Sequence, residues 1–191
     1  MDAKEYLLSL LAILTGLAIS DMVVSLHGLL RRFRQVHWDW LPVTAAALIF
    51  AVIVNSWWIS WNSKWEGMTP VEFMIVLGQL ISMFLAAKAI LPDDKDEDRL
   101  DLLDYYRRTN RYVWTAVSAA CLFMIVQAVY GGNPLQDPIG FLLWSAPFFI
   151  YSGVALMLTW IQRMTLHRVV VPVLLIINLI ESSAQHMTTP L

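Results

Sequence analysis

Charged residues are scarce in this sequence of 191 residues. Asp, Glu, Lys and Arg together make up 15% of it, whereas soluble domains contain about 25%. Hydrophobic residues make up 58%, they occur in long runs, and the mean hydropathy is +0.60. This combination excludes an ordinary soluble domain and indicates an integral protein of a lipid bilayer. The net charge of −2 gives no reason to expect a nucleic-acid partner.

Cysteine is almost absent, since Cys121 is its one occurrence. A single cysteine excludes an internal disulfide, a dithiol redox pair and a metal site built from several cysteines. The sequence also contains no His-Glu-x-x-His, no Gly-x-Ser-x-Gly and no phosphate-binding glycine loop. We therefore expect no catalytic residues, no metal centre and no cofactor. His27 and His167 are conceivable as axial haem ligands, but no other feature of the sequence supports haem.

Six apolar stretches predict an all-α fold, a polytopic transmembrane helix bundle that forms one domain, residues 1–191. The expected spans are residues 6–30, 41–61, 71–91, 112–130, 139–160 and 166–184. A helix rises about 1.5 Å per residue, so about 20 apolar residues cross a hydrocarbon core of about 30 Å. The sixth span is the weakest, because its purely apolar part covers residues 169–180 alone.

One sizeable polar stretch, residues 92–111, separates the third and fourth spans. Its acids come first and its bases last, which complements a helix dipole. We expect a short cytoplasmic helical extension that begins near Asp96 and continues without a break into the fourth span. Its candidates for binding a cytoplasmic partner protein are Asp98, Asp101, Asp104, Arg107 and Arg108.

Basic residues gather in the loops that follow the first, third and fifth spans. The ten are Arg31, Arg32, Arg34, Lys95, Arg99, Arg107, Arg108, Arg111, Arg163 and Arg168, against Lys4 and Lys64 on the other side. The positive-inside rule places these loops in the cytoplasm and both termini on the outer side of the membrane. Lys88 stands at the cytoplasmic end of the third span, where we expect it to snorkel to the interface rather than to pair with Asp21.

Small residues recur every four positions in the first span, at Ala12, Gly16 and Ser20. This spacing lets two helix backbones approach closely in lipid. Together with Asp21 on another face, it predicts that the first span lies inside the bundle. The corresponding packing candidates in the third span are Gly78 and Ala86.

Polar residues fall on single faces of several spans, and polar groups within a bilayer must face protein or water. The candidates for a pore or polar interior are Asp21, Asn55, Glu72, Gln79, Ser82 and Ser152. They could line a hydrated path, or they could bond helix to helix without a path. Glu72 also fits a structural role, because a helix begun by Thr69 and Pro70 places it where a carboxylate complements the dipole. For Asp21, we expect water or His167 as the neighbour.

Several short motifs occur together in the first part of the chain. They are Glu5-Tyr6, Gly16-Leu17-x-Ile19, Arg31-Arg32-x-Arg34-x-Val36, Trp40, Asn55-x-Trp57-Trp58, Leu91-Pro92, and Tyr106 with Arg111 and Trp114. Over about residues 5–115 the chain resembles an uncharacterised family of small, six-span bacterial inner-membrane proteins. The resemblance implies the six-span layout and a bacterial inner membrane, whose outer side, where the termini are expected, is the periplasm. It implies no activity.

The leading functional hypothesis is a homo-oligomeric membrane protein that conducts ions or forms a pore. The small-residue stripes suit subunit contacts, and the polar faces suit a path. The alternatives are a small-solute transporter and a non-transporting anchor or partner subunit that docks through residues 92–111. A channel requires Asp21 or Gln79 to face a shared axis, a transporter requires an enclosed midplane cavity, and an anchor requires neither.

Overall fold

The computed structural model describes residues 3–62, 68–93, 100–131 and 138–188. The helices over these residues are α1 (Ala3–Arg31), α2 (Trp40–Asn62), α3 (Pro70–Ile90), α4 (Leu102–Gly131), α5 (Pro138–Trp160) and α6 (Met164–Thr188). Two short strands accompany them, β1 (Val36–His37) and β2 (Leu100–Asp101). All six helices are long and apolar enough to cross a membrane, which confirms the predicted all-α transmembrane bundle. The weak sixth span is included, since α6 supplies 20 suitable residues from Met164 to Ser183.

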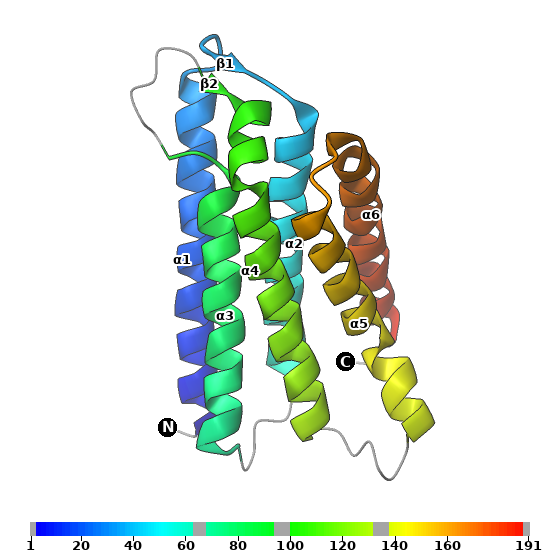
Figure 1. The fold of residues 1–191 in the computed structure, drawn as a ribbon. Helices are drawn as coiled ribbons and strands as arrows, with labels where there is room; N and C mark the ends of the chain where they lie inside the picture. Colours follow the sequence, from blue (N-terminus) through cyan, green and yellow to red (C-terminus); the bar gives the residue numbers. More distant parts are fainter. Residues whose placement is uncertain (1–2, 63–67, 94–99, 132–137, 189–191) are drawn as a thin grey trace.

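The helices run alongside one another, and β1 and β2 lie at the end of the bundle where α1 ends and α4 begins (Figure 1). α4 packs against α3 and α5, α2 packs against α6, and α1 packs against α3 and α2. Fully buried side chains from five helices form the core: Leu41, Ala86, Ile90, Tyr106, Val113, Leu158 and Val171. Large apolar side chains are exposed around the outside, among them Ile13, Val24, Ile139, Leu142, Ile176 and Ile180. An apolar exterior of this kind suits contact with lipid.

The position of α1 differs from the prediction. Its buried side chains, Leu11, Ala18, Met22 and Leu29, face α2 and α3, and they are not the small-residue stripe. Ala12, Gly16 and Ser20 are all exposed, and no atom of another helix lies within 4 Å of a Cβ added at Gly16. The expectation that the stripe packs inside the bundle was therefore wrong for a single chain. The larger apolar residues of α1 bury more surface than the stripe, and burial decides which face turns inward.

The start of α4 also differs from the prediction. Residues 100 and 101 are not helical, because they pair in parallel with β1, Val36 opposite Leu100 and His37 opposite Asp101. The helix begins at Leu102, while Asp96, where we expected its start, lies outside the described residues. Asp101 sets the boundary, since its Oδ1 accepts a hydrogen bond of 3.0 Å from the backbone N–H of Asp104 and so caps the helix.

The structure confirms the expected structural role of Glu72 at the start of α3. Its carboxylate accepts a bond of 2.6 Å from the backbone N–H of Thr69, and the Thr69 hydroxyl accepts one of 3.3 Å from the backbone N–H of Glu72. Pro70 occupies the first helical position, where its missing N–H costs nothing. In this reciprocal capping box, the Glu72 carboxylate has a hydrogen-bond partner at the start of the helix.

Candidate functional site

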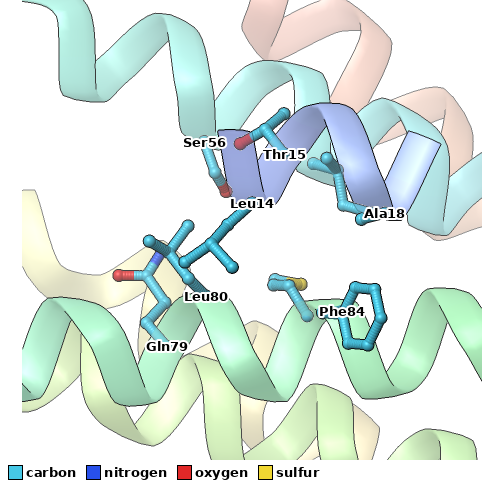
Figure 2. Close-up of a pocket in the computed structure, with 9 residues that line it drawn as sticks. Leu14, Thr15, Ala18, Ser56, Gln79, Leu80 and Phe84 are labelled. Atoms are coloured by element: carbon cyan, nitrogen blue, oxygen red, sulfur yellow. The ribbon is translucent and has the colours of Figure 1, made fainter. Parts of the chain in front are cut away.

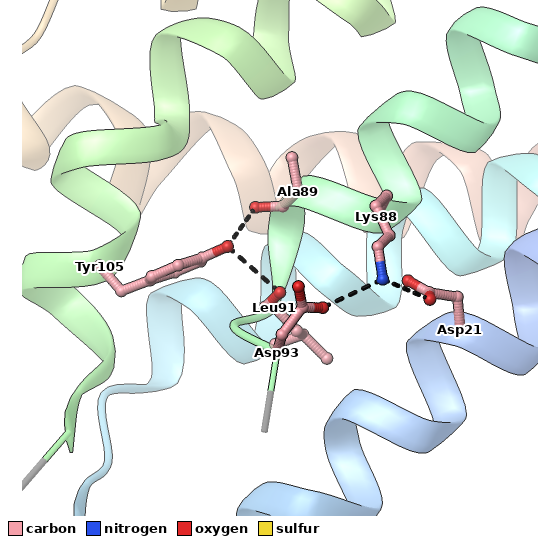
Figure 3. A network of polar contacts seen from close by, with 6 residues as sticks. All are labelled: Asp21, Lys88, Ala89, Leu91, Asp93 and Tyr105. Atoms are coloured by element: carbon pink, nitrogen blue, oxygen red, sulfur yellow. Dashed lines mark hydrogen bonds and ion pairs between the residues drawn. The ribbon is translucent and has the colours of Figure 1, made fainter. Parts of the chain in front are cut away.

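The most prominent polar contact between two spans joins α1 to α3. Lys88 Nζ donates to Asp21 Oδ1 at 2.7 Å and to Asp93 Oδ1 at 3.1 Å (Figure 3). The expectation that Lys88 would snorkel without pairing was therefore wrong. Its side chain is 45% exposed, so the ammonium reaches the bundle end and Asp21 together. The packing of α1 on α3 brings the acid to the base.

Asp21 forms fewer hydrogen bonds than Lys88. Its side chain is 24% exposed, and its second carboxylate oxygen, Oδ2, is buried without a hydrogen-bond partner. The pair with Lys88 offsets the charge of Asp21, and an acid deep in a span is tolerated in the membrane when it is paired. Asp21 is therefore paired with Lys88 and is not an isolated charge in its span.

His167, the other neighbour expected for Asp21, takes part in a separate network. Its Nδ1 lies 2.9 Å from the Tyr106 hydroxyl, and its Nε2 lies 3.0 Å from the carbonyl oxygen of Ile161. Because a carbonyl can only accept, Nε2 carries the proton and Nδ1 accepts from Tyr106. Trp114 Nε1 donates to the Tyr106 oxygen at 2.9 Å, which completes a buried chain of three side chains. Both ring nitrogens of His167 thus already form hydrogen bonds. His167 could act as an axial metal ligand only by breaking one of these bonds.

A narrow crevice with mostly apolar walls lies between α1, α2 and α3 (Figure 2). Two adjoining spaces share Thr15, Ser56, Gln79 and Leu80 in their walls. Gln79 is buried, and its Oε1 accepts a hydrogen bond of 2.9 Å from Gln127 Nε2 on α4. Each space leaves about 10 Å³ for the centre of a water-sized sphere, which is room for about one water molecule. The crevice can hold water beside Gln79, but it is too narrow for a hydrated ion.

The other polar-interior candidates do not complete a path through this crevice. Asn55 is half-buried on α2, and Ser152 is buried on α5, but neither lines the two spaces. Ser82 is buried on α3 and donates within its own helix to the Gly78 carbonyl at 2.8 Å. Asp21 lies outside the crevice walls as well. These candidates therefore do not line one continuous path through the described part of the chain, and Gln79 and Asp21 are the two that are shown to bond to a neighbouring helix.

The predicted partner-binding segment forms the charged first turns of α4. Arg107 and Arg108 are exposed, and Arg108 forms an ion pair with Asp104 one turn earlier. The backbone N–H of Asp104 donates to Asp101 and holds the pKa of the Asp101 carboxyl below its ordinary value. His37 of β1 lies 3.3 Å from the same carboxylate. Asp98 lies outside the described residues.

Sequence reasoning missed several polar residues that the helices bring together. They are Tyr106, Trp114, Gln127, Tyr151, Asn178 and Glu181. A signal existed for part of this set, since Tyr106 and Trp114 lie on a single face of α4. The pairing of that face with His167 depends on how α4 and α6 pack, and one sequence does not contain that information.

The packing candidates of α3 lie where the prediction places them. Ala86 is fully buried, and a Cβ added at Gly78 would lie 2.6 Å from Cζ of Phe123 on α4. This close approach of α3 to α4 also brings Gln79 to Gln127.

No family model, curated protein or solved structure matches this chain. The resemblance to a six-span bacterial family therefore stays a prediction. From its helices, the chain is a multi-pass integral membrane protein.

Proposed function

We propose that the protein is a homo-oligomeric, ion-conducting membrane protein in which the exposed small-residue face of α1 forms the contact between protomers. One observation carries this proposal: Ala12, Gly16 and Ser20 form an exposed stripe on α1 that none of the described residues of the other helices covers. Small residues at this spacing promote close helix association in lipid, because they allow the two backbones to approach. A second copy of α1 supplies a face of matching shape, as a symmetric contact requires.

The polar residues on this face support the same arrangement. Ser9 and His27 are exposed on the stripe together with Ser20. Polar groups at these positions are better placed against protein or water than against acyl chains. Arg31 is also exposed and lies one turn after His27, at the end of the helix. A path along this contact would therefore have a basic mouth, and rings of basic side chains favour anions.

The crevice inside one chain favours a path between protomers over a path within a protomer. Its two spaces hold about one water each, and the ionised pair of Asp21 and Lys88 lies outside them. A small-solute transporter requires an enclosed cavity near the midplane of the bundle, and these spaces are too small for a solute.

The test compares Gly16→Leu with Gly153→Leu. Gly153 is the matched control, because a Cβ added at either glycine meets no atom of the described residues within 4 Å. We expect Gly16→Leu to shift the protein from oligomer to monomer in detergent or nanodiscs, measured by light scattering or native mass spectrometry. In liposomes it should also lower ion flux, and the wild-type reversal potential should lie towards that of chloride. Equal oligomeric states for the two variants would refute the α1 contact.

A non-transporting partner subunit is the second candidate, favoured by the exposed charges of Arg107 and Arg108 at the first turns of α4. α4 begins at the end of the bundle that carries β1 and β2 (Figure 1), and a soluble partner could reach exposed side chains in its first turns there. If wild-type liposomes show no flux although the oligomer persists, this candidate becomes the leading one. Arg107→Gln with Arg108→Gln should then abolish partner binding and leave assembly unchanged.

A further inference from the structure

A second polar cluster lies between α5 and α6, away from the crevice and the ion pair. Tyr151 Oη of α5 donates to Glu181 Oε2 of α6 at 3.4 Å, which is a long hydrogen bond. The side-chain amide of Asn178, one turn before Glu181, also interacts with the Tyr151 hydroxyl. Figure 1 shows α5 and α6 running alongside each other, but their main packing partners are α4 and α2 respectively. The three side chains therefore bridge two helices that make little backbone contact.

Asn178 shows that the cluster is incomplete as it stands. The residue is 5% exposed, and its buried Oδ1 has no hydrogen-bond partner among the residues that the structure describes. A buried acceptor left unpaired costs roughly 1–3 kcal/mol. Native proteins usually satisfy such an atom with a partner, a water molecule or an ion. The free oxygen lies on the same side of α6 as Glu181, since residues three apart are neighbours on a helix.

Glu181 brings a charge that the described part of the chain does not neutralise. It lies in the last turns of the membrane span Met164–Ser183, and its side chain is half-buried. Among the residues whose side chains the structure describes, no lysine, arginine or histidine lies within ion-pair distance of it, whereas Asp21 and Asp39 both have a basic partner. An ionisable residue inside a span is a candidate functional site, because a membrane charge is costly when it is not compensated.

We propose that Glu181, Asn178 and Tyr151 bind a small monovalent metal cation of the Na⁺ type. The cluster offers a carboxylate, an amide oxygen and a hydroxyl oxygen, and hard cations prefer oxygen ligands. A monovalent cation neutralises the single negative charge of Glu181, whereas a divalent cation would leave a net positive charge in the membrane. The cation satisfies Asn178 Oδ1 and links α5 to α6 where backbone packing is sparse. This site is independent of the proposed α1 contact.

The test measures how Na⁺ changes the melting temperature of the full chain in detergent. The nine tryptophans provide an intrinsic fluorescence signal for unfolding. Choline chloride replaces NaCl at constant ionic strength, so that general screening stays the same. A cation that binds the folded state raises the melting temperature with concentration. We expect a rise of a few degrees for the wild type as Na⁺ replaces choline.

Variants locate the effect at the proposed oxygens. Glu181→Gln and Asn178→Leu keep the side-chain size and should abolish the Na⁺-dependent rise, and Tyr151→Phe should reduce it. Ser183→Ala is the control, because Ser183 is exposed on the same part of α6 and bonds within its helix to the Ile180 carbonyl. An absent Na⁺ effect in the wild type overturns the site, as does an unchanged effect in Glu181→Gln.

Discussion

At the residue scale, the contact of Lys88 with Asp21 and Asp93 is the main ionic link between α1 and α3. Lys88 donates to both acids, whereas Asp21 has one oxygen bonded and one buried without a partner. Lys88 and Asp21 therefore differ in the contacts that each keeps when the other residue is replaced. Lys88 would keep Asp93 and water, because its side chain is 45% exposed. Asp21 would keep a carboxylate that is mostly shielded from water.

This asymmetry gives a prediction for two single variants and their double. Lys88→Met should destabilise the protein more than Asp21→Asn, because it leaves the Asp21 carboxylate unpaired. For Lys88→Met, the loss in the free energy of unfolding should lie between about 0–1 kcal/mol, typical of exposed pairs, and about 3–5 kcal/mol, typical of breaking a buried pair. The double variant should recover part of the Lys88→Met loss, since the uncompensated charge is then gone.

Unfolding in mixed micelles with rising SDS measures these free energies, and the double-mutant cycle isolates the coupling. If Asp21→Asn costs as much as Lys88→Met, the predicted asymmetry is wrong. If the double variant equals the sum of the singles, the two residues are not coupled. The same set in liposomes shows whether Asp21, a candidate for a pore or polar interior, affects permeation.

The Lys88 pair also shows how far residue-level prediction reaches. The sequence places Lys88 at the end of its span, and the structure agrees with that depth. It does not show which neighbour stands beside it, because adjacency of α1 and α3 follows from packing along the whole length of both helices. The same holds for His167, whose partners Tyr106 and Trp114 belong to a distant part of the chain.

At the element scale, the helices could be predicted closely and the short strands could not. Apolar length alone located all six spans, and caps such as Thr69 with Glu72 are visible in the sequence. β1 and β2 have two residues each, too few for an alternating pattern to appear. The inward face of α1 was mispredicted because its small residues fit a helix contact equally well inside a chain or between chains.

The contact of α3 with α4 depends on the absence of a side chain at Gly78. A Cβ there would lie 2.6–2.9 Å from three ring atoms of Phe123, closer than side chains can pack. Gly78→Ala should therefore force the ring or the helices apart and destabilise the protein by about 1–3 kcal/mol, the usual cost of overpacking. Phe123→Leu should relieve the clash when combined with Gly78→Ala.

Thermal unfolding in detergent measures both changes, with Gly153→Ala as the control. A Cβ at Gly153 meets no atom within 4 Å, and alanine favours a helix more than glycine does, so the control should be neutral or slightly stabilising. A Gly78→Ala variant as stable as the control would mean that the ring moves away freely, and the close approach of α3 to α4 would then have no energetic weight.

At the scale of the whole molecule, the basic residues gather at one end. The turn after α1, the start of α4 and the turn between α5 and α6 all lie at the end that carries β1 and β2 (Figure 1). Contacts at this end join distant segments: Arg168 of α6 donates to Asp39, the residue before α2, at 2.9 Å, and Arg111 lies over the ring of Trp160, 5.5 Å from its centre. Basic residues at this end therefore also tie helices of the bundle together.

This arrangement predicts that the basic end faces the cytoplasm and that both termini face outward. Six spans place the two termini on the same side, and Lys and Arg are retained on the cytoplasmic side during insertion. Cysteines introduced at Ala3 and at Thr188, in a Cys121→Ser background, should react with a membrane-impermeant maleimide on intact cells. Arg34→Cys, exposed in the turn after α1, should react only after the membrane is permeabilised. Protection of both terminal cysteines together with labelling at position 34 would invert the topology. Labelling of one terminus alone would mean an odd number of crossings, and one of the six helices would then not span the membrane.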